Sequence, residues 1–442
     1  MKLLKRFLSA TMCFIILFQV SAFSVSADNG ARYELDFDVN ARAYIVVSLD
    51  TGEVIFEKNS QDRLIPASLT KLMTAYVAMK YIDDLDGTMI TAPNVIYDEL
   101  YGLNSSTADI RQGEVLSARR LLYALLLPSA NEAASILAYY IGNGNIDNFL
   151  MIMNSEAKKL GCTNTNFTNV HGLFTDNHYT SAYDMYLIAK ACYETEGFMD
   201  IVTKTRYELP TNKKHATPYY ILSTVKMQNA SSPYYRDYVR GMKTGSLPEI
   251  GHNFVSLCEN NEEKYICVVI GADNTGDKYA AFVSTAQIMD YFFENYSLRQ
   301  ANTSELPVTE VAVRYSKETD KVLLYADTPV KAILPNSADE STFLKKYNLP
   351  KYVDAPLSEG DTVGTVEYYL GNSLVGTSDL KVHENVDRSL LMLVVGKFQE
   401  AYSSLYFRTV LCVSAVLIAL YLVMLVIVNK RNDKKQKIRR RR

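Results

Sequence analysis

The pattern of hydrophobic and polar residues along this 442-residue chain first predicts a sheet covered by helices. Two short apolar runs joined by an Asp-Thr-Gly turn, within 43–56, predict paired strands. Apolar residues then recur at helical spacing in five segments, 69–77, 116–127, 132–141, 146–160 and 181–193. Extended patterns return at 238–243, 254–258 and 265–271, and an amphipathic helical pattern follows at 280–296. Strands at both ends with helices between them predict an α+β domain.

A second pattern begins after residue 298. The segment 299–307 changes in composition, and short alternating runs separated by turn residues follow it, at 311–315, 322–325, 330–334 and 362–366. Such runs are typical of a small all-β domain. We therefore predict an α+β domain over 28–298, a small β domain over 299–386, and a connector over 387–408 with some helical amphipathicity.

The two ends of the chain predict export and membrane anchoring. Basic residues, an apolar run over 7–20 and a small-residue cleavage site ending at Ala27 are typical of a signal peptide, 1–27, with an uncleaved anchor as the alternative. The segment Thr409–Val428 has 20 residues and no charge, and as a helix it spans about 30 Å, the thickness of the hydrocarbon layer. Nine Lys and Arg residues within 429–442 predict a cytoplasmic tail, so the rest lies outside a single-pass membrane protein.

The charge and the cysteine content of the chain argue against some classes of function. The predicted signal peptide and tail together hold twelve basic residues and one acidic residue, Asp433. The exported region keeps 34 of the 46 basic and 48 of the 49 acidic residues, so its net charge is near −14. An acidic exported region argues against a nucleic-acid partner. Cys258 and Cys267 flank a polar turn, which leaves open a disulfide or two buried free thiols. No Cys or His spacing indicates zinc, and we predict neither a metal nor a cofactor.

Three short motifs occur in order along the α+β domain: Ser68-Leu69-Thr70-Lys71, Ser129-Ala130-Asn131 and Lys243-Thr244-Gly245. The SxxK pattern alone is weak, because it also occurs at Ser155, Ser223 and Ser378. Only Ser68 precedes both SxN and KTG. A serine at a helix start with a lysine three residues later places a nucleophile and a base on one helical face, provided that the pKa of the lysine is lowered.

The other two motifs suit roles around that serine. Ser129 lies in the break between two helices, where its hydroxyl can pass a proton to a leaving amine and Asn131 can hold Lys71 and a substrate amide. An N-cap is the structural alternative for Ser129. Lys243 and Thr244 close an extended run, where a cation and a hydroxyl suit a carboxylate, and Gly245 lets substrate approach closely.

The ordered motif set resembles that of serine acyltransferases that bind penicillin. Six stretches are similar to D-alanyl-D-alanine carboxypeptidases, the low-molecular-weight penicillin-binding proteins: 65–73, 125–133, 169–173, 179–184, 241–245 and 355–361. The resemblance implies a penicillin-binding/β-lactamase-like domain that removes the terminal D-alanine from peptidoglycan stem pentapeptides, with β-lactams as covalent inhibitors and the lipid bilayer as anchor. It assigns Ser68, Lys71 and Ser129 to catalysis, and Asn131, Lys243, Thr244, Gly245 and Ser246 to substrate binding, with the N–H groups of Ser68 and Ser246 as the oxyanion hole.

Departures from the family pattern keep alternatives open. Ser246 and Leu247 follow KTG where a bulky residue and threonine are usual, and Lys278 stands near the place of an arginine that helps to hold the carboxylate. A serine β-lactamase shares the motifs, but no ExxLN-like glutamate follows SxN. A non-catalytic β-lactam receptor is the other alternative, although the short tail has no room for a signalling domain.

Overall fold

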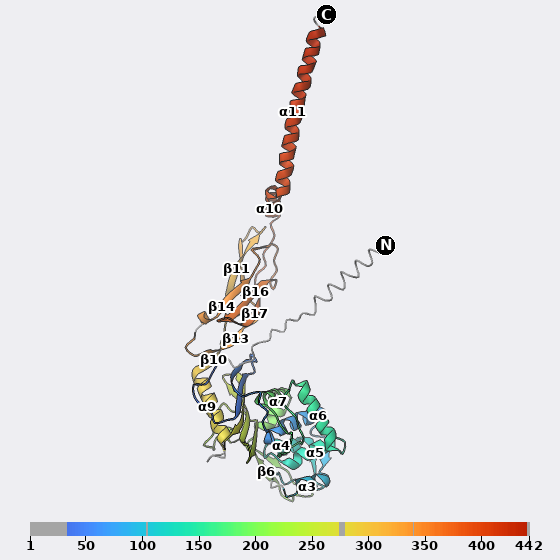
Figure 1. Ribbon diagram of the computed structural model, residues 1–442, viewed down its shortest axis with the longest axis vertical. Helices are drawn as coiled ribbons and strands as arrows, with labels where there is room; N and C mark the ends of the chain where they lie inside the picture. The colour runs from blue at the N-terminus through green and yellow to red at the C-terminus, as the bar shows by residue number, and fades with distance from the viewer. Residues whose placement is uncertain (1–32, 103–104, 274–278, 339, 440–442) are drawn as a thin grey trace, which may run out of the picture. The chain divides into compact units, whose positions relative to one another are not determined.

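The computed structural model describes residues 33–102, 105–273, 279–338 and 340–439. The chain divides into two compact units between Asn295 and Tyr296 (Figure 1). The predicted signal peptide and Lys278 lie outside the described residues, and so do the last three residues of the tail.

A five-stranded antiparallel sheet forms the centre of the first unit. Its order is β2-β1-β9-β8-β7, with β1 at Ala43–Ser48, β2 at Val54–Lys58, β7 at Lys243–Leu247, β8 at Gly251–Asn260 and β9 at Glu263–Ala272. All six residues of β1 are buried, because helices cover both faces of the sheet. Strand β7 is the last strand on one side, so one of its edges is not paired within this sheet.

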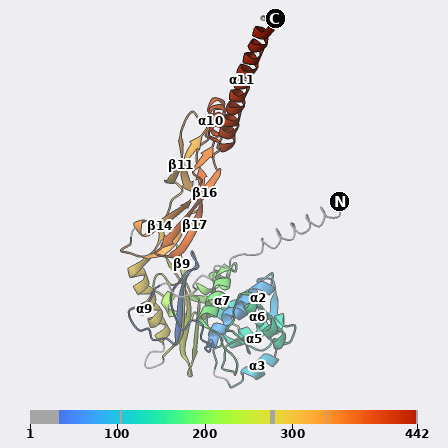
Figure 2. The same cartoon turned by 45° about the horizontal axis from the view of Figure 1, so that its top comes forward.

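Helices cover the sheet unequally. Helix α9 (Ala280–Asn295) packs on β8 and β9, and its Phe292 meets Tyr265 of β9 and Phe56 of β2 edge-to-face. The other helices gather on the opposite face: α2 (Thr70–Tyr81), α3 (Val95–Leu100), α4 (Ala118–Leu126), α5 (Asn131–Ile141), α6 (Ile146–Lys159), α7 (Ala182–Glu194) and α8 (Phe198–Val202). Figure 2 shows α9 on one side of the sheet and α2, α5, α6 and α7 on the other. This arrangement confirms the predicted α+β class.

One predicted strand of this unit needs correction, and the open question about its two cysteines is answered. The strand predicted over 238–243 begins only at Lys243. Gly241 has φ +78°, a left-handed backbone conformation that interrupts an extended strand. Cys258 and Cys267 are free thiols: Cys258 stands opposite Tyr265 and Cys267 opposite Ser256, so the two cysteines are out of register. Small antiparallel pairs complete the unit, β3 (Met89–Thr91) with β4 (Val115–Ser117) and β5 (Arg206–Leu209) with β6 (Tyr219–Leu222).

The second unit contains the β domain and two helices. Its six-stranded sheet has the order β14-β16-β17-β12-β11-β15, over Leu344–Asn348, Thr362–Leu370, Ser373–Val382, Lys321–Ala326, Pro307–Arg314 and Tyr352–Asp354. Strand β10 (Tyr296–Gln300) pairs with β13 (Lys331–Pro335). Helix α10 (Leu390–Ser403) and helix α11 (Leu405–Arg439) follow. The segment Leu405–Asn432 is long and apolar enough to cross a membrane, which extends the span predicted at 409–428.

Candidate active site

Ser68 lies in a short 3-10 helix, Ala67–Leu69, immediately before α2, rather than within the α-helix itself. Asn253 of β8 holds the segment that leads into this turn, since its amide donates to the carbonyls of Ile65 (3.1 Å) and Pro66 (3.0 Å). The buried Asn253 oxygen in turn accepts from the Gly271 N–H at 2.8 Å. The position of Ser68 is therefore fixed from the sheet as well as from the helix.

Lys71 is buried beneath Ser68. Its Nζ atom lies 3.0 Å from Ser68 Oγ and donates to the His171 carbonyl at 2.6 Å. Burial lowers the pKa of Lys71 well below that of a free lysine, and the nearby charge of Lys243 lowers it further, while Glu132 opposes the shift. A neutral amine at this place donates one N–H to the carbonyl and turns its lone pair toward the serine hydroxyl.

Ser129 occupies the loop between α4 and α5, with φ +69°. The N-cap of α5 is Ala130, so the N-cap alternative for Ser129 is wrong. The Ser129 hydroxyl instead accepts a hydrogen bond from Lys243 Nζ at 2.9 Å. The strained loop thus turns this hydroxyl away from the helix end and toward β7.

The KTG motif begins the edge strand β7. Lys243 is fully buried and also donates to the Thr244 carbonyl at 2.9 Å, and burial lowers its pKa to about 7. The Thr244 hydroxyl shares a 2.6 Å hydrogen bond with Thr224. At Gly245 a Cβ atom would lie 3.0 Å from the Pro66 carbonyl oxygen and 3.2 Å from the Ser68 nitrogen. Glycine thus allows close packing against the Ser68 turn, and Gly245 also lines the cavity, where the predicted approach of substrate stays a prediction.

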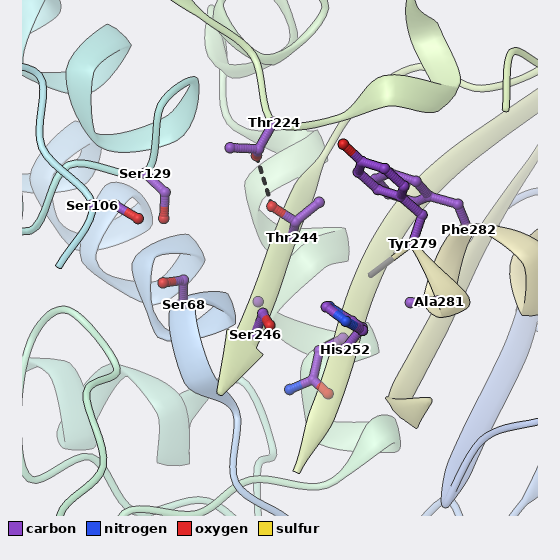
Figure 3. Close-up of a pocket in the computed structure, with 12 residues that line it drawn as sticks. Ser68, Ser106, Ser129, Thr224, Thr244, Ser246, His252, Tyr279, Ala281 and Phe282 are labelled. Carbon is purple, nitrogen blue, oxygen red and sulfur yellow. Dashed lines mark hydrogen bonds between the residues drawn. The ribbon is translucent and has the colours of Figure 1, made fainter. Parts of the chain in front are cut away.

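These groups meet in one cavity of about 310 Å³, which we call the serine cavity. Ser68, Ser129, Thr244, Gly245 and Ser246 line it, and Ser106, Thr224, His252 and Tyr279 are among the remaining wall residues (Figure 3). Lys71, Lys243 and Asn131 are buried and do not line the cavity. Both lysines therefore contact hydroxyl groups of the cavity wall from beneath it.

Asn131 takes a different place from the one expected. It is the first residue of α5, and its backbone N–H donates to the Ser106 carbonyl at 2.9 Å. Lys71 forms hydrogen bonds with Ser68 and the His171 carbonyl, whereas the sequence predicts a contact with Asn131. Asn131 thus positions the segment that carries Ser106 on the wall of the cavity.

The loop 169–173 was missed as a functional element, although its sequence is one of the six family-like stretches. Asn169 Oδ1 accepts from the N–H groups of His171 (3.3 Å) and Gly172 (2.6 Å), and its amide donates to the Leu173 carbonyl (2.8 Å). These bonds aim the His171 carbonyl at Lys71. His171 Nε2 lies 3.2 Å from Glu99 Oε1, and burial lowers the pKa of the imidazole.

Gly172 lets this loop touch the nucleophile turn. Its φ is +87°, and a Cβ atom there would lie 1.9 Å from the Ala67 carbonyl oxygen. The Gly172→Ala variant must therefore displace either the loop or the Ser68 turn, and we expect acylation by penicillin to slow by at least about tenfold. Acylation rate and thermal midpoint are the quantities to measure.

Gly52 offers a matched control for that variant. It has φ +72° in the turn between β1 and β2, and a Cβ atom there would meet nothing within 4 Å. Gly52→Ala should cost about 1–2 kcal/mol of stability through backbone strain and leave acylation unchanged. Wild-type acylation by Gly172→Ala would contradict the assigned role of this contact.

Among the described residues, no group of three or more His, Cys, Asp or Glu side chains is arranged to bind a metal. The cavity presents the Ser68 hydroxyl, which contacts the buried Lys71 amine, and the Ser129 hydroxyl, which is held by the buried Lys243. Such a set supports acyl transfer through a serine ester.

Comparisons with known proteins agree with this chemistry. Residues 27–274 match the family described as D-alanyl-D-alanine carboxypeptidase, and residues 293–388 match the C-terminal domain of penicillin-binding protein 5. The chain is 26% identical over 387 residues to D-alanyl-D-alanine carboxypeptidase DacF of Bacillus subtilis, covering 87% of this chain and 96% of that protein.

Solved structures extend the likeness to the fold. Penicillin-binding protein 5 of Haemophilus influenzae superposes with a TM-score of 0.61 at 26% identity, over 80% of this chain and 99% of that one. A mutant of the Streptomyces K15 DD-transpeptidase gives a TM-score of 0.54 at 25% identity, over 58% of this chain and 99% of that one. Because the first family match covers more than half of the chain, the protein belongs to the serine D-alanyl-D-alanine carboxypeptidases, the low-molecular-weight penicillin-binding proteins.

Proposed function

We propose that the protein removes the terminal D-alanine from peptidoglycan stem pentapeptides through an acyl-enzyme on Ser68. The observation that carries this proposal is the buried pair of lysines, one 3.0 Å from the Ser68 hydroxyl and the other 2.9 Å from the Ser129 hydroxyl. Family membership supports the substrate class. β-Lactams acylate the same serine because their strained amide occupies the place of the D-Ala-D-Ala bond.

Acylation begins with proton transfer from Ser68 to neutral Lys71. The Ser68 oxygen then attacks the carbonyl of the penultimate D-alanine. The backbone N–H groups of Ser68 and Ser246 stabilise the oxyanion. Both residues line the serine cavity, and the close packing of Gly245 against the Ser68 turn brings β7 next to that turn.

Departure of D-alanine needs a proton on the amine and a site for the carboxylate. Ser129 passes on to the amine the proton that Lys71 took from Ser68, so that Lys71 is neutral again, and Lys243 beneath Ser129 stabilises its oxygen during the transfer. The carboxylate binds at the Thr244 hydroxyl, with the charge of Lys243 below the cavity wall. Water then hydrolyses the Ser68 ester, with Lys71 acting again as the base.

Release of D-alanine tests the proposal. The full chain in detergent should liberate one D-alanine from each stem pentapeptide, and the Ser68→Ala variant should lose at least about 10⁴-fold of this activity. D-Alanine release that persists in Ser68→Ala would reject Ser68 as the nucleophile.

We also propose that α11 anchors the protein in the cell membrane with the Ser68 unit outside. The length and apolar composition of Leu405–Asn432 support a span, and the basic residues that follow favour the cytoplasmic side. Protease added to intact cells should remove the Ser68 unit. Complete protection of that unit would refute this orientation.

A further inference from the structure

A polar pocket of about 380 Å³ lies at the tip of the hairpin formed by β7 and β8. Strand β7 ends at Leu247, which pairs with Gly251 of β8, and the turn over 248–250 joins the two strands and lines the pocket. Residues before β1 and at the end of β9 complete its walls, and we call it the hairpin pocket. It begins just beyond Ser246, the last residue of β7 that lines the serine cavity.

The proposed reaction places the hairpin pocket on the acyl side of the scissile bond. Thr244 serves the departing D-alanine, whereas Ser246 holds the carbonyl of the acyl group through its oxyanion N–H. Figure 3 shows Thr244 and Ser246 following one another along one strand, and the hairpin turn comes after Ser246. An extended peptide rises about 3.3 Å per residue, so a stem that continues along the open edge of β7 brings the residue before D-alanine to this turn. The hairpin pocket therefore faces the third residue of the stem.

Two opposite charges line the hairpin pocket. The side chains of Arg42 and Glu249 are exposed, and neither forms an ion pair with a described residue. The Arg42 backbone is fixed, because its N–H donates to the Ile270 carbonyl at 3.0 Å and its carbonyl accepts from the Asn59 amide at 2.9 Å. Its aliphatic stem packs over Gly271, where a Cβ atom would lie 2.8 Å from Arg42 Cδ. The guanidinium is thus carried on a held stem and keeps its charge available to a ligand.

A ligand that satisfies both charges carries an ammonium and a carboxylate close together. In stem peptides of the diaminopimelate type, the third residue has a long side chain whose last carbon bears both of these groups. In stem peptides of the lysine type, the same side chain ends in an ammonium alone. We infer that the hairpin pocket binds the zwitterionic end of diaminopimelate, with Arg42 on its carboxylate and Glu249 on its ammonium. Asp273 lines the same pocket and adds a second carboxylate that suits the ammonium.

This inference rests on the proposed function and adds no chemical step to it. Arg42 and Glu249 lie outside the serine cavity, so their contacts hold the stem while the reaction proceeds at Ser68. Benzylpenicillin has an uncharged side chain on its acyl group and therefore has nothing to place between the two charges. Its rate of acylation reports the Ser68 machinery alone.

The test compares two pentapeptides and uses the full chain in detergent. One has meso-diaminopimelate as its third residue and the other has L-lysine. We expect kcat/KM for the diaminopimelate peptide to be at least about fivefold higher. Arg42→Gln should lower that value to the level of the lysine peptide and leave the lysine peptide within about twofold. Arg42→Glu should reverse the preference, because the new carboxylate attracts the ammonium of lysine and repels the carboxylate of diaminopimelate. Poor folding does not produce a reversal.

Two further variants keep the test decisive. Glu249→Gln should lower kcat/KM for both peptides, since both carry the ammonium. Lys190→Gln, on α7 outside the hairpin pocket and the serine cavity, should change neither. All of these variants should react with benzylpenicillin at the wild-type rate. Equal wild-type activity on the two peptides, or a diaminopimelate preference that survives Arg42→Glu, overturns this inference and leaves the carboxypeptidase standing. Failure of the wild type on both peptides overturns the proposed function itself.

Discussion

Replacing Lys71 with arginine should slow acylation of Ser68 by about 10²- to 10⁴-fold. Arginine keeps the positive charge but does not lose its proton in proteins, so it has no lone pair to accept the Ser68 proton. The wild-type amine lies 3.0 Å from that hydroxyl and is already biased toward the neutral form by burial. The rate of covalent labelling by a fluorescent penicillin measures the effect.

Lys80 gives the matched control for this variant. It lies on the same helix, α2, but is partly exposed and pairs with Glu156 at 2.6 Å. Lys80→Arg preserves that ion pair and should label at the wild-type rate. If Lys71→Arg also labels at the wild-type rate, Lys71 is not the base.

The second large effect is on the pH dependence of acylation. Only neutral Lys71 accepts the serine proton, and its neutral fraction falls about tenfold for each pH unit below its pKa. Because burial and the Lys243 charge lower that pKa, acylation should rise with pH through a group well below the free-lysine value and reach its plateau earlier than an ordinary lysine allows. The second-order acylation constant reports the groups of the free enzyme.

The alkaline side should be set by the other lysine. Burial lowers the pKa of Lys243 to about 7, so its charge is lost as the pH rises above that value. Attraction for the β-lactam carboxylate then declines, and the profile becomes bell-shaped, with apparent pKa values that belong to the lysine pair. A β-lactam ester without that carboxylate should show a weaker alkaline decline. A rate that still rises steeply near pH 10 would contradict the lowered pKa of Lys71.

The sequence predicted the contact between Ser68 and Lys71, because that contact is local. Ser68 and Lys71 are one helical turn apart, and the helix start fixes their separation whatever the rest of the fold does. The order of the three motifs then selected Ser68 from four SxxK matches. The alternation of strands and helices likewise predicted the α+β unit and the β domain.

The groups that hold the site were not predicted, because they depend on contacts between distant segments. The His171 carbonyl reaches Lys71 across 100 residues, and Asn253 reaches Pro66 across 187. The hydrophobic periodicity of the sequence does not predict such contacts. A signal did exist at Asn169 and Gly172, since an amide and a glycine three residues apart are typical of a tight turn that another backbone approaches closely.

Helix starts and strand starts were the least accurate part. Gly241 lies inside the strand predicted over 238–243, and its positive φ shows that the chain turns there before β7. The close approach of the Pro66 carbonyl to Gly245 was not predicted either, because it joins segments that are far apart in the sequence.

The intact mass of the full chain after exposure to penicillin tests the central claim most directly. The account predicts one added penicillin per protein, found on the peptide that contains Ser68, and no added mass in the Ser68→Ala variant. Ser106→Ala, which removes another hydroxyl from the wall of the same cavity, should still accept one penicillin. An adduct on any other residue, or one that survives Ser68→Ala, would contradict the assignment of Ser68 as the nucleophile.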